Sequence, residues 1–373
     1  MRTFDLAEAR LGHTYQQVQN AASSAIYVPW LTSTQALVKD TALAFSGPAW
    51  PQEAQGLSLA ATRRYNRFQW SIAGLSDKAI RREHMAKGFP AEIVRVDTKD
   101  DITLTGMVIR PTVSAVKPLP IVWIHGYTGN FHEDTTCRLG PEFASRGFTF
   151  VAGDNRGHDF GVVLRKKGPE YFGQPTWLGG AGWEKFSESV HDVDAWISFA
   201  TAELGFPGVI LLGHSYGGTK VVNYMGKRQD ERVKGLICAS PGARMREMWE
   251  DPAAVEKARQ LVAAGRGEEL MTIGNGPTRE VSAIAYLDRF EGNVDVFGYQ
   301  TPEAPITRIG CPILVWYGTN ESWLADPSVL EFIKKQAKSS PRVEVHLIEG
   351  ADHWYQGTEK AVADIVTAWA ATL

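Results

Sequence analysis

The chain reads Val209-Ile210-Leu211-Leu212-Gly213-His214-Ser215-Tyr216-Gly217-Gly218 over the stretch that decides its fold. Four apolar residues of strand length lead into Gly213, and residues 219–225 continue with a helical pattern. Between a buried strand and a helix, the spacing Gly213-x-Ser215-x-Gly217 is typical of a nucleophile elbow, a turn that exposes a serine hydroxyl above a sheet. Glycine at both flanking positions removes side chains that would collide in such a tight bend. An ordinary Gly/Ser turn has the same spacing, so the prediction rests on the flanking strand and helix.

This strand, elbow and helix resemble the α/β-hydrolase superfamily, and the resemblance extends over residues 91–373 as an ordered set of parts. It implies a mostly parallel central sheet with helices on both faces. The core is predicted over residues 91–241 and 309–373, and a helical cap or lid is predicted over residues 242–308. Residues 1–90 read as an N-terminal helical extension, which could cover the active site, form a homodimer surface or pack on the core.

Composition narrows the possible partners of the protein. The 373 residues are 44% hydrophobic and 22% charged with a net charge of −3, which is typical of a soluble globular protein and offers no basic excess for nucleic acid. Neither a signal-like apolar segment at the N-terminus nor a run of eighteen apolar residues is present in the sequence, so no membrane partner is predicted. Cys137, Cys238 and Cys311 are scattered and odd in number, which favours reduced thiols and a cytoplasmic setting.

The oxyanion hole is expected after an apolar strand upstream of the elbow. Residues 93–96 and 102–110 predict an antiparallel hairpin at the start of the core, and residues 120–124 predict a buried strand that runs into His125-Gly126-Tyr127. In similar hydrolases the residue after His-Gly lends its backbone N–H to the oxyanion, which implies Tyr127 here. Tyr216, directly after Ser215, would supply the second N–H. His125 and His214 are interpreted as buried structural residues rather than proton carriers.

A second turn follows the strand that ends near Gly153. Its sequence Asp154-Asn155-Arg156-Gly157 matches an Asp-x-Arg-Gly motif with which the family holds this loop through charge-assisted hydrogen bonds. Metal binding by Asp154, His158 and Asp159 is an alternative on residue type alone, but the chain has no HExxH and no paired Cys motif. No metal and no cofactor are therefore predicted.

The acid and the base of a triad are expected after the last two strands. Residues 312–317 lead into Gly318-Thr319-Asn320-Glu321, where many relatives carry aspartate in a Gly-x-x-Asp turn, so the resemblance implies Glu321 as the acid. Asp326 is the rival, although a helix N-cap role before Pro327 explains it fully. His353, in a Gly-x-x-His turn after the last strand, is the implied general base, whereas His346 lies inside that strand.

These residues predict a serine hydrolase that cleaves an ester or lactone of a small, fairly hydrophobic metabolite, with no cofactor. The loops at residues 125–130, 155–159 and 213–215 also resemble, less closely, a branch that includes siderophore esterases. Two alternatives remain open. One uses the same triad for carbon–carbon bond hydrolysis or acyl transfer in a biosynthetic pathway, and the other is a non-catalytic hydrolase fold that binds a ligand.

Overall fold

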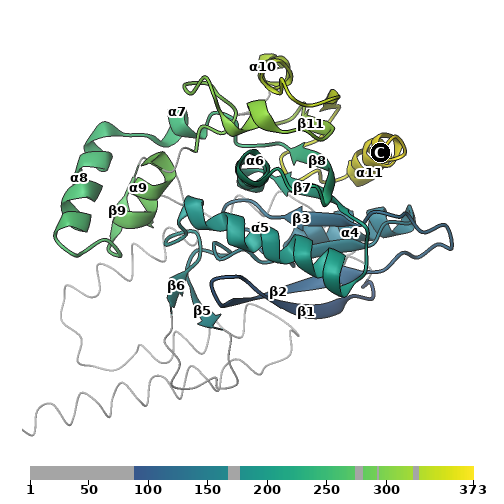
Figure 1. Ribbon diagram of the computed structural model, residues 1–373, viewed down its shortest axis with the longest axis horizontal. Coiled ribbons are helices and arrows are strands. Elements are labelled where there is room, and N and C mark those ends of the chain that lie inside the picture. Colours follow the sequence, from purple (N-terminus) through teal and green to yellow (C-terminus); the bar gives the residue numbers. More distant parts are fainter. Residues whose placement is uncertain (1–87, 167–176, 274–279, 292–293, 322–326) are drawn as a thin grey trace, which may run out of the picture. The chain divides into compact units, whose positions relative to one another are not determined.

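The computed structural model describes residues 88–166, 177–273, 280–291, 294–321 and 327–373 (Figure 1). The chain divides into two compact units, Met1–Met85 and Ala86–Leu373. The predicted N-terminal helices therefore lie outside the described residues, apart from residues 88–90. Everything below concerns the second unit.

A large sheet forms the centre of this unit, and within the described residues it has ten strands in the order β12-β11-β8-β7-β3-β4-β2-β5-β6, with β1 paired to β2. From β4 to β12 all neighbours are parallel, whereas β1, β2, β5 and β6 pair antiparallel. The strands are β1 Glu92–Asp97, β2 Ile102–Ile109, β3 Ile121–Ile124, β4 Phe150–Gly153, β5 Val162–Lys166, β6 Trp177–Gly179, β7 Val209–His214, β8 Val233–Ala239, β11 Ile313–Gly318 and β12 Val343–Ile348. The mostly parallel sheet predicted from the sequence is confirmed.

Two hydrophobic cores cover the two faces of the sheet, because side chains alternate along each strand. On one face, Val122 and Leu211 pack with helices α5 (Ser189–Ser198), α6 (Tyr216–Arg228) and α10 (Ser328–Gln336). On the other, Trp123 and Leu212 pack with α4 (Asp134–Ser145) and α11 (Glu359–Ala370). The predicted helices on both faces are thus present, and they leave the carboxyl ends of the parallel strands together at one edge.

The predicted entry hairpin is confirmed, since β1 pairs antiparallel with β2 from Glu92↔Val108 to Asp97↔Thr103. The sequence did not predict the strands β5 and β6 or their antiparallel pairing.

The segment 242–308 contains helices α7 (Met245–Trp249), α8 (Pro252–Ala263), α9 (Ala283–Glu291) and η3 (Pro305–Arg308). Helix α8 begins at Pro252 because Asp251 accepts a hydrogen bond from the Ala253 N–H and proline is well suited to the first helical position. Strands β9 (Leu270–Thr272) and β10 (Glu280–Ser282) pair between α8 and α9, which the sequence did not predict. Figure 1 shows α8 and α9 side by side, beyond the end of α5.

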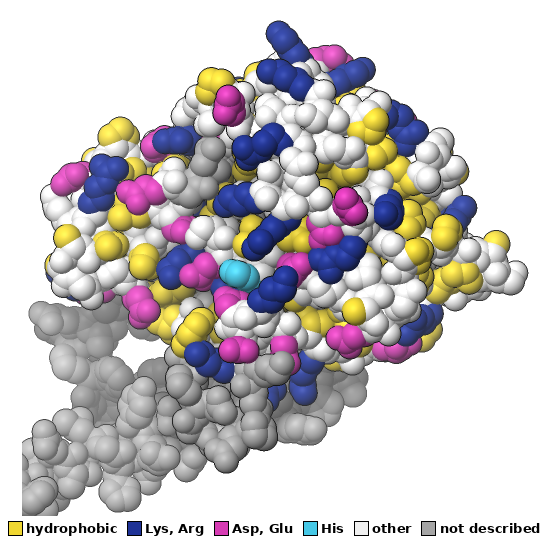
Figure 2. Space-filling model, viewed as in Figure 1, with side chains coloured by type: hydrophobic (Ala, Val, Ile, Leu, Met, Phe, Trp, Pro, Cys, Tyr) yellow, Lys and Arg dark blue, Asp and Glu magenta, His cyan; other side chains and the backbone are white. Residues whose placement is uncertain are grey.

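Basic and acidic side chains are interspersed over the face of the molecule drawn in Figure 2, in keeping with the small net charge. Across the part of the chain that the structure describes, no helix is both long enough and apolar enough to cross a membrane.

Candidate active site

Ser215 lies at the junction of β7 and α6 with a backbone conformation that only a tight elbow imposes. Its φ is 54° and its ψ is −122°, a sparsely populated region for a residue with a Cβ. The Ser215 N–H donates to the carbonyl of Ala239 at 2.9 Å, so the neighbouring strand β8 holds the turn in place. The structure therefore contains the predicted strand, sharp turn and helix.

The two flanking glycines of the elbow are required by close backbone approach. A Cβ on Gly213 would lie 2.3 Å from the Gly217 oxygen, and a Cβ on Gly217 would lie 2.1 Å from the Ile124 oxygen. Both distances are far below van der Waals contact, and each involves backbone that cannot move aside. The backbone of the elbow is thus in close contact with the end of β3, where the oxyanion hole is expected.

Glu321 is the centre of a hydrogen-bond network at the end of β11. Its side chain is buried, and its Oε1 accepts from the Ser240 hydroxyl at 2.5 Å and from the Gly318 N–H at 2.6 Å. Its Oε2 lies 2.9 Å from the Nδ1 of His353. Because the carboxylate accepts at this contact, Nδ1 carries the proton and Nε2 keeps its lone pair, as a general base needs. The structure thus brings the two predicted residues together, whereas Asp326 lies outside the described residues.

Two residues that the sequence analysis missed support this carboxylate. The Tyr355 hydroxyl donates to the Ser240 Oγ at 2.6 Å, and Ser240 in turn donates to Glu321. Tyr355 and Ser240 are both fully buried, with positive φ values of 59° and 45°. Ser240 follows β8 directly at the same sheet edge, and this strand-end position was the signal that could have identified it.

His214 and His353 are in direct contact. The Nε2 of His214 lies 2.8 Å from the His353 carbonyl, and the ring centroids are 4.9 Å apart. Burial, and secondarily the neighbouring His353, lower the pKa of His214 to about 3, so it stays neutral and donates through Nε2. His125 is also fully buried and has a pKa well below its ordinary value, chiefly because burial disfavours the charged ring. Both are hydrogen-bonded structural residues, as the sequence predicts.

The lowered pKa of His214 predicts acid sensitivity. Since the unfolded chain protonates this histidine near pH 6.5 and the folded chain only near 3, stability is fully present above about pH 6.5 and falls as the pH drops toward 3. The expected slope is up to about 1.4 kcal/mol per pH unit. His214→Gln, which keeps an N–H donor at a similar reach, should flatten that dependence. Urea unfolding at pH 7.5 and 5.0 measures the difference, and an equal loss in both proteins would contradict the assignment.

Gly126 places the Tyr127 turn directly beside Ser215. A Cβ on Gly126 would lie 2.9 Å from the Ser215 Cβ and 3.4 Å from its Oγ. Tyr216 begins α6, so its N–H belongs to the positive end of the helix dipole. The rings of Tyr127 and Tyr216 then meet edge to face, with centroids 6.1 Å apart. The two residues expected to form the oxyanion hole are therefore neighbours beside the Ser215 hydroxyl.

Arg156 holds the loop after β4 in the manner that the sequence motif predicts. Its buried guanidinium bonds Asp192 at 2.9 Å and also reaches Asp100 and Glu188. Gly157 packs on Glu184, because a Cβ there would lie 2.2 Å from that carboxylate. Asp192 is fully buried, and it neutralises Arg156 across two elements that no local sequence pattern brings together.

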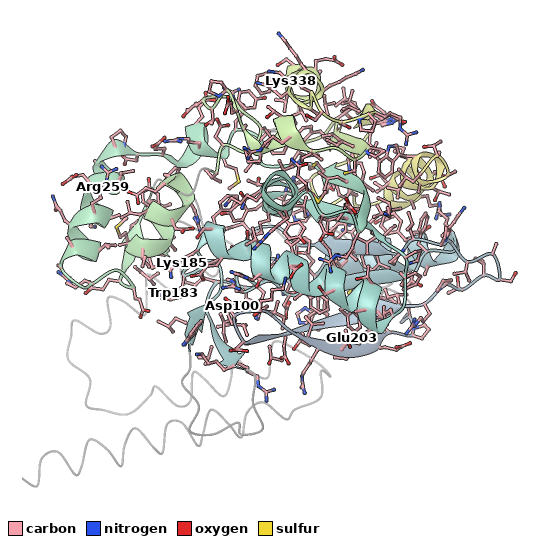
Figure 3. The ribbon with its side chains drawn as sticks, viewed as in Figure 1. Asp100, Trp183, Lys185, Glu203, Arg259 and Lys338 are labelled. Atoms are coloured by element: carbon pink, nitrogen blue, oxygen red, sulfur yellow. The ribbon has the colours of Figure 1, made fainter. Side chains whose placement is uncertain are left out.

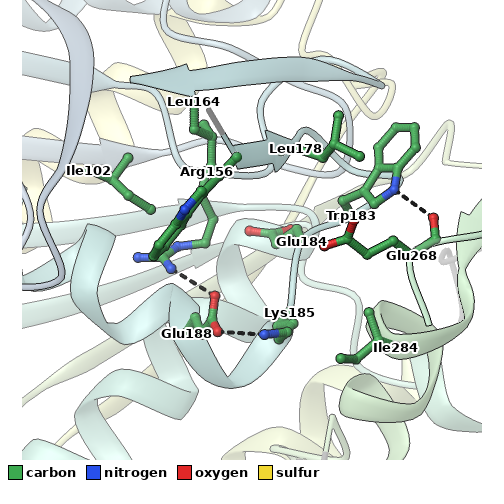
Figure 4. Close-up of a pocket in the computed structure, with 12 residues that line it drawn as sticks. Ile102, Arg156, Leu164, Leu178, Trp183, Glu184, Lys185, Glu188, Glu268 and Ile284 are labelled. Carbon is green, nitrogen blue, oxygen red and sulfur yellow. Dashed lines mark hydrogen bonds and ion pairs between the residues drawn. The ribbon is translucent and has the colours of Figure 1, made fainter. Parts of the chain in front are cut away.

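A cavity of about 350 Å³ opens beside this loop (Figure 4). Trp183, Glu184 and Ile284 line it, and its other walls come from the β5–β6 hairpin and from Arg156 and Glu188. The Trp183 indole donates to the Glu268 carbonyl at 2.9 Å, which links the loop before α5 to the segment 242–308. Residues 177–179 and 183 thus form part of the rim of this cavity.

Asp154, His158 and Asp159, which the sequence analysis considered as an alternative metal site, form hydrogen bonds within the protein. Asp154 accepts from the Phe131 N–H at 3.0 Å, and His158 Nδ1 lies 2.8 Å from Asp159. Within the described ranges, no group of three or more His, Cys, Asp or Glu side chains is arranged to hold a metal ion. These side chains instead fasten the loops after β3 and β4 to each other.

A mostly parallel sheet that delivers a serine elbow, a buried carboxylate and a histidine to one edge defines the α/β-hydrolase fold. Comparison with known proteins agrees: residues 121–365 match the family described as "Alpha/beta hydrolase family". The chain therefore belongs to this family and is an α/β-hydrolase.

Individual relatives are distant. The non-heme chloroperoxidase CPO-A1 of Kitasatospora aureofaciens is 22% identical over 266 residues, which are 63% of this chain and 84% of the relative. Among solved structures, Est1E from Butyrivibrio proteoclasticus with ferulic acid bound is 17% identical with a TM-score of 0.52, over 74% of this chain and 97% of the other. The α/β hydrolase GrgF from Penicillium sp. is 14% identical with a TM-score of 0.56, over 76% and 98%. These structures share the fold.

Proposed function

We propose that the protein is a serine esterase that cleaves a carboxylic ester or lactone of a small, fairly hydrophobic metabolite through an acyl-enzyme on Ser215. The observation that carries this proposal is the 2.9 Å contact between His353 Nδ1 and Glu321 at the sheet edge where β7 ends in the Ser215 elbow. In this arrangement Glu321 orients the imidazole, and the Nε2 lone pair of His353 is available as a base.

The proposed reaction has two balanced halves. Ser215 Oγ attacks the ester carbonyl carbon while its proton passes to His353 Nε2, and the carbonyl oxygen becomes an oxyanion held by the Tyr127 and Tyr216 N–H groups. The intermediate then expels the alcohol, which takes the proton from His353. A water molecule next attacks the acyl-enzyme, gives its proton to His353 and releases the acid, and Ser215 recovers its proton. Glu321 stays ionised throughout and stabilises the imidazolium that forms.

The segment 242–308 is proposed as the cap that bounds the substrate pocket, and its helices α8 and α9 supply an apolar interior. Ala254 and Ala258 on α8 and Tyr286 and Phe290 on α9 belong to the same core as Tyr216. These side chains are buried in the core, and we infer that an apolar cap of this kind favours an uncharged, hydrophobic acyl or alcohol group.

Turnover of p-nitrophenyl esters from acetate to octanoate tests the proposal, together with labelling by a fluorophosphonate. We expect ester cleavage with an optimum at one chain length, and labelling that requires Ser215. An alcohol acceptor added to the assay separates hydrolysis from acyl transfer by the products. A folded protein that reacts with the probe but cleaves no ester would instead favour the carbon–carbon alternative, and one that the probe does not label would favour the ligand-binding alternative.

A further inference from the structure

Arg289 on α9 is a fully buried cation with 1% of its surface exposed. Removing a guanidinium from water costs several kcal/mol even after relaxation, and an apolar side chain of similar volume often gives a more stable fold. Because burial of this charge is costly, the groups that the guanidinium contacts indicate its role. Figure 3 offers a contrast on the neighbouring helix α8, where Arg259 points outward and forms only an exposed ion pair with Glu291 at 3.6 Å.

The guanidinium of Arg289 lies against the two tyrosines of the oxyanion hole. Its central carbon is 5.1 Å from the ring centroid of Tyr127 and 5.9 Å from that of Tyr216, within cation–π range of both. The Tyr127 side chain is also hydrogen-bonded with Arg289. The Nη2 of Arg289 donates to the Ala181 carbonyl at 2.8 Å. One side chain thus connects the turn after β3, the first residue of α6, the loop before α5 and helix α9.

Other buried residues also pack on the ring of Tyr216. Phe186 packs on the Tyr216 ring with centroids 5.8 Å apart, and Lys220 Nζ lies 5.1 Å from its centroid. Lys220 is itself buried and paired with Glu184 at 2.5 Å. The ring of Tyr216 is therefore enclosed by residues of the core, and Arg289 is a cation that helix α9 adds to this enclosure.

Burial distinguishes two roles that a cation near a hydrolytic site could have. A guanidinium that recognises a substrate carboxylate needs a face open to the pocket, whereas Arg289 is 1% exposed while Tyr127 and Ser215 remain partly exposed. Its contacts are instead to the side chains whose backbone N–H groups must point at the oxyanion. Those groups work only when their direction is fixed before the reaction begins.

We propose that Arg289 is a positioning residue that fixes Tyr127 and Tyr216 and so makes the oxyanion hole depend on the segment 242–308. The inference rests on the proposed esterase function. It predicts that loss of the guanidinium lowers kcat without a comparable change in KM, because the oxyanion exists in the transition state and not in the bound ester.

The test compares Arg289→Met, Arg289→Lys and the matched surface control Arg259→Met on the ester that the wild type cleaves best and on its thionoester. Sulfur is larger and accepts hydrogen bonds poorly, so the preference for the oxygen ester reports directly on the oxyanion hole. We expect Arg289→Met to lower kcat for the oxygen ester by about 10- to 100-fold and to reduce that preference. Arg289→Lys should recover part of both, because an ammonium keeps the cation–π contact. Arg259→Met should stay within about twofold of the wild type.

Four further outcomes complete the test. If Arg289→Met does not fold, Tyr127→Phe replaces it; this variant removes the hydroxyl but keeps the backbone N–H, and it should reduce the preference in the same direction. Equal losses on the ester and the thionoester would overturn the inference and leave a purely structural role. A rise in KM confined to esters that carry a carboxylate would overturn it in favour of anion binding. A wild type without Ser215-dependent turnover would instead refute the proposed function itself.

Discussion

Ser215→Ala is expected to lower kcat for the best p-nitrophenyl ester by roughly 10⁴- to 10⁶-fold. The substitution removes a single oxygen, which is the atom proposed to attack the ester carbonyl. The backbone of the elbow keeps its support, since the hydrogen bond from residue 215 to the Ala239 carbonyl comes from the main chain. Initial rates measure kcat, and fluorophosphonate labelling of wild type and variant reports the nucleophile directly.

Ser145→Ala is the matched control for this experiment. Ser145 is an exposed serine at the end of α4 whose hydroxyl donates to the Glu142 carbonyl, so its loss should leave kcat unchanged. Retention of more than about 1% of wild-type turnover by a folded Ser215→Ala protein would contradict an acyl-enzyme on this residue, because loss of a serine nucleophile costs far more than that factor.

Glu321→Gln is expected to lower kcat by about 10³- to 10⁴-fold. This is comparable to the loss when the aspartate of a Ser-His-Asp triad is replaced by asparagine. Three donors converge on the carboxylate, from Ser240, Gly318 and His353. An amide offers only one oxygen and adds an NH₂ group, so at least one of these donors would face another donor. The imidazole would then adopt the wrong tautomer or turn away, and the imidazolium would lose its counter-charge.

Asp326→Asn distinguishes the two candidate acids. We expect near wild-type turnover from this variant, because Glu321 already accepts from Ser240 and Gly318 and contacts the Nδ1 of His353. A buried carboxylate contributes to stability as well as to the orientation of the histidine. Circular dichroism therefore serves as the control that both variants are folded. Intact turnover in Glu321→Gln combined with loss in Asp326→Asn would transfer the role of acid to Asp326.

Local sequence patterns were sufficient where a contact is made within a few residues. The apolar strand before Gly213 and the entry hairpin were both predicted, because alternation and turn residues act over short spans. The pairing of β6 with β5 was not predicted, since its short strand carries too little alternation to be distinguished from a loop.

The sequence by itself determined the strand and elbow that present Ser215, and through the family resemblance it named Glu321 and His353. The tertiary structure alone decided which distant side chains complete that edge of the sheet. Ser240 follows β8 and Tyr355 follows β12, and the two residues meet because both strands pair with β11. Asp192 is buried because α5 packs beside the Arg156 loop. Arg289 reaches Tyr127 and Tyr216 only through the packing of α9. Strand order and helix packing bring together residues far apart in the chain, and no local pattern records those pairings.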